Sequence, residues 1–498
     1  MSTTRKVISN TFYLFLDSAV VAGFGYLFWI ILGKMLSPGE LGSYSTIMNI
    51  SLLITAFTAA GFARAGIKLI SEYVAKNKKE YVSGFIWWAT KMSTIVNFIV
   101  IFLLVGYILI LPMVNYLNVY MVVGIILYIF FNTYYVLTSN YLVGLQKMKT
   151  LFNTNLVSYG VKVLSVIVFI SLGWSYFGAL GAFILSAIVA VVFRIKSIPF
   201  ASGKIDFGRN IKYLKSAMVL DTSMVVLNSV NVFILSILTD MYSVGIFTFA
   251  FMFSAAIRLI PTAISTSIMS IGFSHFDIKK IKLIVARAIK YSFIIILPII
   301  SFLFVFSEKI IIILSNTSYL ESVVVMQILL FGSVFIGVSM IISFALYSIG
   351  KIKSSRNILF IGAVVNVLLT ILMVKEYTFI GAAVSFTIAS IIMSLLAFYY
   401  LKKHIKLKFQ FREVFKISIA SILPAIVVFF VSNGNYIGFS RAMFLPVYLI
   451  VYAIMYLLII KLFSVMDLRD KEFILVVEDK VPKKMRKDFR KLLNFYFD

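Results

Sequence analysis

Long apolar runs separated by short charged segments fill most of this chain, and they constrain its fold more than any other feature. A helix needs roughly 20 consecutive apolar residues to cross a bilayer, and most of these runs reach that length. Of 498 residues, 61% are hydrophobic and only 13% are charged, whereas a soluble domain carries about 25% charged residues. The sequence therefore predicts an all-α polytopic membrane protein and excludes an ordinary soluble enzyme.

Fourteen apolar segments can be separated by the charges, prolines and glycines between them. The division is weakest near residue 112, where a proline cuts one over-long run in two. The predicted segments cover residues 9–33, 41–63, 84–111, 117–142, 151–172, 175–194, 213–238, 242–273, 285–306, 323–349, 357–374, 377–401, 415–432 and 443–464.

Basic residues test this topology, because Lys and Arg concentrate in the cytoplasmic loops of membrane proteins. When the loops are assigned to alternate sides, 39 of the 46 Lys and Arg residues fall on one side and 4 on the other. This asymmetry favours fourteen spans with both termini inside the cell. The net charge of +27 then follows from topology, and we expect no nucleic-acid partner.

The two halves of the chain share residues at a spacing of about 200 positions, which indicates an internal repeat. Gly42 aligns with Gly245, and Asp17 falls one residue from alignment with Asp221. An even number of spans separates the copies, so both have the same orientation, as in transporters built from two parallel bundles. The expected regions are an N-lobe of six spans (1–196), a cytoplasmic linker (197–212), a C-lobe of six spans (213–401), two extra spans with a basic loop (402–464) and a cytoplasmic amphipathic tail (465–498).

Three local motifs carry a resemblance to a known family: the turn LSPGELGSY at residues 36–44, its counterpart ending at 244–247, and the small-residue segment at 181–186. They resemble the polysaccharide-export branch of the multidrug/oligosaccharidyl-lipid/polysaccharide (MOP) exporter superfamily, and its O-antigen flippases in particular. The resemblance implies a V-shaped pair of six-helix lobes with two additional helices. It also implies transfer of a polyprenyl-linked oligosaccharide from the inner to the outer leaflet by alternating access.

Arg258 is the leading site candidate, because an ionisable group at the bilayer centre costs about 2.5–3.5 kcal/mol and is therefore rarely kept without a function. It lies near the middle of the eighth segment, one turn before Pro261, which we expect to kink the helix. Its guanidinium group could bind a phosphate bidentately, or it could form an ion pair between helices. Related lipid II flippases use an arginine in the same helix, but where they have arginines in helix 1 this chain has Asp17.

Four further basic residues are candidate contacts for an anionic headgroup, and each has a structural alternative. Lys162 lies midway along the fifth segment, where it would line a cavity or extend toward an interface. Lys91 lies nearer the cytoplasmic end of the third segment, where extension to the interface is the simpler interpretation. Arg64 and Lys68 end the second segment and would form a cytoplasmic mouth or act as positive-inside anchors.

Acidic and amide side chains give each half a polar stripe. Asp17 and Asp221 lie about two turns inside the first span of their halves. Asn10 shares a helix face with Asp17, and Asn228 and Asn231 share one with Asp221. The stripes could bind a coupling ion, either H⁺ or Na⁺, or gate the inner entrance. Alternatively, the carboxylates could form static ion pairs with the membrane-embedded cations.

Several kinds of chemistry are missing from the sequence. The chain has no Cys, only two His, no phosphate-binding Gly-x-x-x-x-Gly-Lys loop and no paired carboxylates in its short outer loops. We therefore expect no catalytic residue, no metal site and no cofactor. The favoured function is a flippase for lipid-linked oligosaccharides, acting as a monomer in the cell membrane beside glycosyltransferases or a polymerase of its pathway. A cation-coupled multidrug exporter and a membrane-embedded polyprenyl-sugar transferase are the alternatives.

Overall fold

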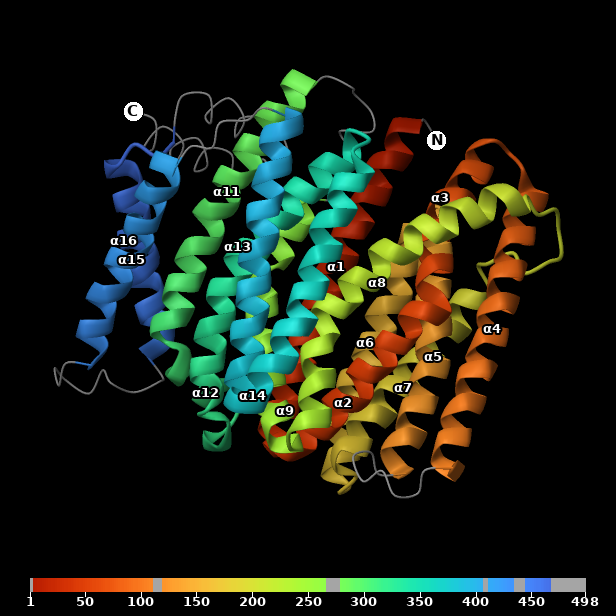
Figure 1. The fold of residues 1–498 in the computed structure, drawn as a ribbon, viewed down its shortest axis with the longest axis horizontal. Helices are drawn as coiled ribbons and strands as arrows, with labels where there is room; N and C mark the ends of the chain where they lie inside the picture. The colour runs from red at the N-terminus through yellow and green to blue at the C-terminus, as the bar shows by residue number, and fades with distance from the viewer. Residues whose placement is uncertain (1–2, 111–118, 266–277, 406–410, 434–443, 467–498) are drawn as a thin grey trace. The chain divides into compact units, whose positions relative to one another are not determined.

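The computed structural model describes residues 3–110, 119–265, 278–405, 411–433 and 444–466, which form helices and contain no strand (Figure 1). The predicted all-α class is therefore confirmed. The helices are α1 (Thr3–Met35), α2 (Pro38–Thr55), a π-helical turn (Ala56–Ala60), α3 (Gly61–Ala75), α4 (Lys79–Ile110), α5 (Val119–Gly144), α6 (Met148–Ser171), α7 (Ser175–Ile195), α8 (Phe207–Leu238), α9 (Met241–Ile257), α11 (Ile278–Val305), α12 (Ser307–Leu314), a 3₁₀ turn (Thr317–Tyr319), α13 (Ser322–Ser348), α14 (Ile352–Ile405), α15 (Phe411–Asn433) and α16 (Leu445–Leu462).

Ten of the helices in the described residues are long and apolar enough to cross a membrane, and a bent pair adds an eleventh. The chain is thus a multi-pass membrane protein. Each of the fourteen predicted segments overlaps a helix, and two of them share the 54-residue α14. The segment 41–63 is interrupted by the π-helical turn, and the segment 213–238 lies within α8. The count of fourteen spans and the orientation of the termini stay predictions.

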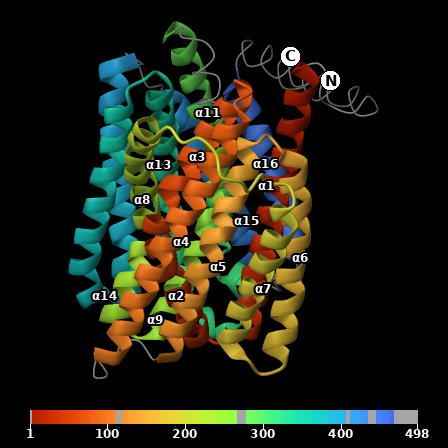
Figure 2. The same cartoon turned by 90° about the vertical axis from the view of Figure 1, so that its right-hand side faces the viewer.

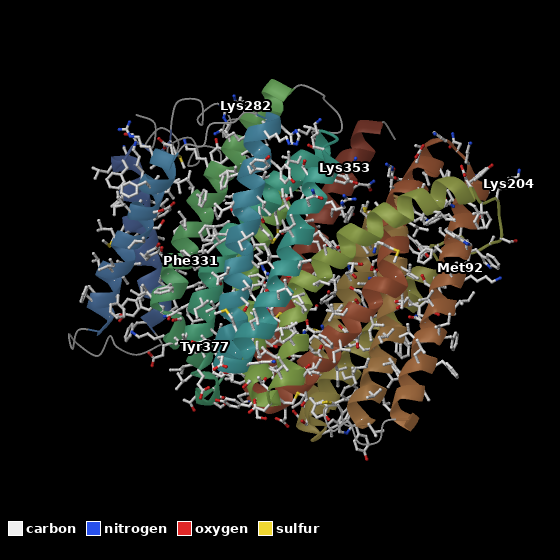
Figure 3. The ribbon with its side chains drawn as sticks, viewed as in Figure 1. Met92, Lys204, Lys282, Phe331, Lys353 and Tyr377 are labelled. Carbon is white, nitrogen blue, oxygen red and sulfur yellow. The ribbon has the colours of Figure 1, made fainter. Side chains whose placement is uncertain are left out.

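Two local breaks interrupt the helices, one beside an expected segment boundary and one inside a predicted segment. Within α14, Thr378 has φ 45° and ψ −125°, which no helical residue adopts. It follows Tyr377, labelled in Figure 3, and lies at the expected boundary between segments 357–374 and 377–401. The π-helical turn Ala56–Ala60 likewise separates α2 from α3 inside one predicted segment.

The first turn of α2 shows how the 36–44 motif folds. Ser37 and Glu40 form a reciprocal capping box, in which the Ser37 backbone N–H donates to Glu40 Oε2 at 2.8 Å. Ser175, at the start of α7, donates to the other carboxylate oxygen of Glu40. Partial burial favours the neutral form of Glu40, but the hydrogen bonds from Ser175 and Ser37 outweigh it, so the pKa of this carboxyl group is lowered from 4.5.

Backbone contacts divide the chain into two compact units, and the boundaries of the predicted lobes stay predictions. The first contains Met1–Phe253, Leu314–Leu329 and Arg356–Met393, and the second contains Ser254–Ile313, Leu330–Ser355 and Ser394–Asp498. In the first unit, α1 packs along α6, α6 packs on α7, and α5 covers α7 (Figure 2). Ile47, Ile129 and Leu180 from α2, α5 and α7 are buried together in its core.

Two glycines of the first unit make reciprocal contacts between α2 and α9. A methyl group at Gly42 would lie 1.8 Å from the carbonyl oxygen of Met241, and one at Gly245 would lie 1.8 Å from that of Pro38. Only glycine allows the two helices to approach this closely. The two contacts are equivalent within the predicted repeat. Gly42 aligns with Gly245, and Pro38 aligns with Met241 at the same spacing.

In the second unit, α15 packs against both α11 and α16. Tyr456 of α16 donates a hydrogen bond to the carbonyl oxygen of Ile294 in α11 at 2.6 Å. This carbonyl has no helical partner, because the residue four positions later is Pro298, which has no N–H. Tyr452 donates to the carbonyl oxygens of Pro298 and Ser421 at 2.9 and 3.0 Å. Tyrosines of α16 thus satisfy backbone groups that a membrane cannot hydrate.

Candidate functional site

A polar seam runs between α1 and α6 in the first unit. Asn155, Tyr159 and Lys162 share one face of α6, since their spacing is i, i+4 and i+7. Asn155 Nδ2 donates a hydrogen bond to Asp17 Oδ1 of α1 at 2.7 Å. With α6 starting at Met148 and a rise of 1.5 Å per residue, Asn155 lies about 10 Å and Lys162 about 21 Å along the helix. The seam therefore extends from the first third of α6 to beyond its middle.

Arg194, in the last turn of α7, connects this seam to α5. Its side chain is completely buried. Nη1 donates to Ser139 Oγ at 2.7 Å and to the Tyr135 carbonyl oxygen at 3.0 Å, and Nε donates to Thr154 Oγ1 at 3.2 Å. Nη2 donates to Asn155 Oδ1, and the guanidinium carbon lies 4.5 Å from the centroid of the Tyr135 ring. These contacts compensate a charge that would otherwise be costly to bury.

Arg194 also sets the orientation of the Asn155 amide group. The amide oxygen accepts hydrogen bonds from Arg194 and from the Tyr135 hydroxyl, the latter at 3.3 Å. Its nitrogen therefore faces Asp17, to which it can only donate. Arg194 interacts electrostatically with Asp17 as well. The carboxylate, which is half-buried, thus lies near Asn155 and Arg194.

Lys162 has a different environment from Arg194. Its Nζ lies 3.9 Å from the ring centroid of Phe28 in α1, and 5.8 and 5.6 Å from those of Tyr159 and Phe183. Phe183 in turn stacks on Tyr128 at 4.0 Å. Ring faces stabilise a cation by about 0.5–2 kcal/mol but do not neutralise it. Within the described residues, no carboxylate or hydroxyl group hydrogen-bonds to this ammonium group.

Arg258 belongs to the second unit and lies at a helix break. The helices Met241–Ile257 and Leu259–Ser265 are bent by 43° on either side of it. The expected kink near Pro261 is therefore present. The proline packs on Gly337, where a methyl group would lie 2.8 Å from Pro261 Cγ. The Arg258 side chain is 9% exposed, so its guanidinium group is held inside the protein.

The remaining basic candidates have more exposed positions. Lys91 is exposed and its Nζ lies 4.9 Å from the centroid of the Trp87 ring, which is itself 41% exposed. Lys68 is exposed on α3. Arg64 lies on the same helix, but its side chain is outside the described residues.

The amide candidates do not share one environment. Asn10 is half-buried on α1. Asn228 is exposed and donates to the carbonyl oxygen of Met224 in its own helix, at 2.7 Å. Asn231 is 1% exposed and exchanges hydrogen bonds with α14, accepting from Asn366 at 2.7 Å. The side chain of Asp221 lies outside the described residues.

Arg194 and Asn155 are site residues that sequence reasoning missed. Arg194 is the last residue of the predicted segment 175–194, where a basic residue is expected at the cytoplasmic end. The sequence signal that could have found it is the pair of small residues Ala187 and Ala190, seven and four positions earlier on the same helix face, a pattern typical of close helix packing. In the part of the chain that the structure describes, no three His, Asp or Glu side chains are grouped so that they could hold a metal ion.

Comparison with known proteins identifies the family of this chain and several relatives. A family model described as polysaccharide biosynthesis protein matches residues 7–269. Two uncharacterized membrane proteins of Methanocaldococcus jannaschii are 25% and 26% identical, over 87% and 80% of this chain and 91% and 100% of their own lengths. A probable low-salt glycan biosynthesis flippase of Haloferax volcanii is 23% identical over 40% of this chain and 43% of its own length.

Solved structures share the fold. The lipid II flippase MurJ in its inward closed conformation has a TM-score of 0.72 and 17% identity, over 92% of this chain and 98% of MurJ. An inward-facing multidrug resistance MATE transporter of the MOP superfamily has a TM-score of 0.66 and 16% identity, over 78% of this chain and 94% of its own. At these identities the likeness concerns the fold alone.

Proposed function

The chain belongs to the polysaccharide biosynthesis protein family, and we propose that it is a flippase of the MOP superfamily for a polyprenyl phosphate- or pyrophosphate-linked oligosaccharide. It moves this substrate from the inner to the outer leaflet by alternating access, for assembly of a surface polysaccharide or glycan. Relatives of named function are flippases or transporters, which favours transport over catalysis.

The proposal includes the topology that the sequence predicts: fourteen spans, both termini inside, and two parallel repeats of six. The reciprocal contacts of Gly42 and Gly245 support the repeat. Gly42 contacts Met241 and Gly245 contacts Pro38, and Pro38 and Met241 occupy equivalent positions of the two copies. A parallel repeat gives two bundles that can rock about a common site, as alternating access requires.

The observation that carries the proposal is the ammonium group of Lys162. The group lies among aromatic rings, about 21 Å along a membrane-spanning helix, and no carboxylate among the described residues neutralises it. A charge in such a position is costly and attracts a counter-ion strongly, because the surrounding dielectric constant is low. The phosphate of a lipid-linked sugar must leave the headgroup region during transfer, and Lys162 offers it a counter-charge.

Arg258 is the second proposed phosphate contact. Its guanidinium group is held inside the second unit at a helix break. A planar guanidinium group matches a phosphate bidentately, which an ammonium group does not. Lys91, Lys68 and Arg64 remain proposed contacts for the headgroup at the start of the pathway.

Transfer of a lipid-linked oligosaccharide across proteoliposomes tests the proposal. We expect the wild-type protein to move the substrate, and Lys162→Gln and Arg258→Gln to reduce the rate at least tenfold. Lys149→Gln is the matched control, since Lys149 is an exposed lysine on the same helix as Lys162. Thermal unfolding of each variant confirms that it is folded.

Each outcome separates the alternatives. Transfer by wild type that survives both substitutions would keep the flippase and reject the two phosphate contacts. If folded wild-type protein moves no polyprenyl-linked glycan, the flippase assignment is wrong. Export of cationic drugs would then indicate the multidrug exporter, and sugar transfer between polyprenyl lipids would indicate the transferase.

A further inference from the structure

We propose that the rings of Phe28, Tyr159 and Phe183 form a binding cage for a small organic cation of the quaternary ammonium class. In the wild-type protein the ammonium group of Lys162 occupies this aromatic cage and keeps such cations out. The proposed function makes the same lysine a phosphate contact. The cage is tested by binding alone, however, so the two proposals can fail separately.

Rings from three helices converge on one point. The Nζ atom of Lys162 lies over the Phe28 ring of α1, 3.9 Å from its centroid. The centroids of Tyr159 in α6 and Phe183 in α7 are 5.8 and 5.6 Å from the same atom. A cation within about 6 Å of a ring centroid is attracted by the negative face of the ring, and groups of such rings recognise quaternary ammonium ligands. The spacing of the three rings therefore fits a cation.

Further aromatic contacts hold two of the cage rings in place. Phe28 is completely buried and makes an edge contact with Tyr44, with the centroids 6.0 Å apart. Phe183 is 9% exposed and stacks on Tyr128, with the centroids 4.0 Å apart and the ring planes inclined by 3°. A site that is already arranged loses little free energy to ordering when a ligand binds. We therefore expect the cage to persist when the Lys162 side chain is shortened.

The chemistry of the cage favours an organic cation over a metal ion. Metal ions such as Ca²⁺ and Mg²⁺ need several oxygen ligands, which ring faces do not supply. A quaternary ammonium group has no N–H to satisfy, so it loses no hydrogen bond on entering the cage. Lys162 is half-buried, which means that the cage is not sealed from its surroundings.

Occupancy by Lys162 turns the cage into a determinant of specificity. The ammonium group is tethered to α6, so it is present at the cage whether or not a ligand is bound. A second cation would meet both its volume and its like charge, in a medium of low dielectric constant. Selectivity often depends on such a repulsive element in addition to an attractive one. Lys162 thus attracts anions and denies cations a site that the rings alone would offer.

Binding of tetramethylammonium to the full-length protein in maltoside micelles tests the proposal. Saturation-transfer NMR detects the N-methyl protons of the bound ligand. We expect no transfer with wild type and a clear signal with Lys162→Ala, which removes the ammonium group and most of its stem. A ligand this small should bind the variant with a Kd of ~1–10 mM. tert-Butanol, a neutral molecule of similar shape, should give no comparable signal.

Three results of this experiment would overturn the proposal. The first is equal binding of tetramethylammonium to wild type and Lys162→Ala. The second is the absence of binding to folded Lys162→Ala, and the third is equal binding of tert-butanol to that variant. If Lys162→Ala does not fold, Lys162→Ser opens the same cage and replaces it in each comparison.

Further variants test which groups form and fill the cage. Phe28→Leu in the Lys162→Ala background removes the nearest ring and should weaken binding about tenfold. Phe15→Leu is the matched control, because Phe15 lies on the same helix and is 70% exposed, and it should leave the Kd unchanged. Lys162→Met fills the cage with a neutral side chain and should bind no tetramethylammonium. An unchanged Kd in the Phe28→Leu double variant would refute the cage, and binding by Lys162→Met would refute its occupancy by residue 162.

Discussion

Replacing Tyr456 by phenylalanine removes one hydroxyl group from a buried contact between helices. The structure predicts a loss of folding stability whose size depends on a proline in another helix. The hydroxyl donates to the Ile294 carbonyl oxygen at 2.6 Å. In an unbroken helix this carbonyl would accept from residue 298, but Pro298 has no N–H. Tyr456→Phe therefore leaves an acceptor without a donor in a region without water.

The expected loss of unfolding free energy follows from the lack of a replacement donor for the Ile294 carbonyl group. Hydrogen bonds between membrane helices contribute on average about 0.6 kcal/mol and at most about 1.7 kcal/mol. An acceptor left unsatisfied costs about 1–3 kcal/mol. Because Pro298 offers no replacement, we expect Tyr456→Phe to lower the free energy of unfolding by about 1.5 kcal/mol. Reversible unfolding in mixed detergent micelles measures this value.

A double-mutant cycle with Pro298 tests whether the missing proline N–H explains this cost. Pro298→Ala restores the backbone N–H and hence the helical bond to Ile294, so Tyr456→Phe should cost only about 0.5 kcal/mol in that background. Tyr399→Phe serves as the control for the substitution itself, because the Tyr399 side chain is 59% exposed. An equal cost of Tyr456→Phe in both backgrounds would show that the missing proline N–H is not the reason for the contact.

Three further predictions concern the first unit. Gly42→Ala and Gly245→Ala should each destabilise the protein by about 2 kcal/mol or more, and by similar amounts, since each methyl group would lie 1.8 Å from a backbone oxygen; markedly unequal thermal unfolding of the two would contradict the reciprocal contact. Glu40 has a lowered pKa, so it stabilises the folded state above its ordinary value of 4.5 and loses this effect as the pH falls through the folded pKa. The difference in thermal stability between wild type and Glu40→Gln should accordingly be present at neutral pH and vanish in acid, and persistence in acid would speak against it. Ser175→Ala should cost about 1 kcal/mol at neutral pH and less in acid, because the lost hydrogen bond is to an ionised group; a pH-independent loss would mean that the bond is not charge-assisted.

Local sequence patterns were sufficient for the helices and for some of their interruptions, but not for the π-helical turn Ala56–Ala60 inside the segment 41–63. Apolar runs predicted helices at all fourteen positions, and the kink near Pro261 is present as a 43° bend. Such features could be predicted because a helix satisfies its backbone within four residues, so a few neighbouring side chains decide where it starts, bends and ends.

The sequence by itself also identified charged residues that a membrane makes costly, and its local motifs indicated the polysaccharide biosynthesis family. It did not determine which of those charges are compensated. Arg194 ends the predicted segment 175–194, yet the fold buries it completely against α5 and α6. Among the described residues, no carboxylate or hydroxyl group hydrogen-bonds to Lys162, which lies among aromatic rings of three helices. Asp17 accepts a hydrogen bond from Asn155, which is 138 residues away in the sequence. Only the tertiary structure decided these pairings, because the partners of a buried charge are set by helix packing across the whole unit and leave no periodic signal in the local sequence.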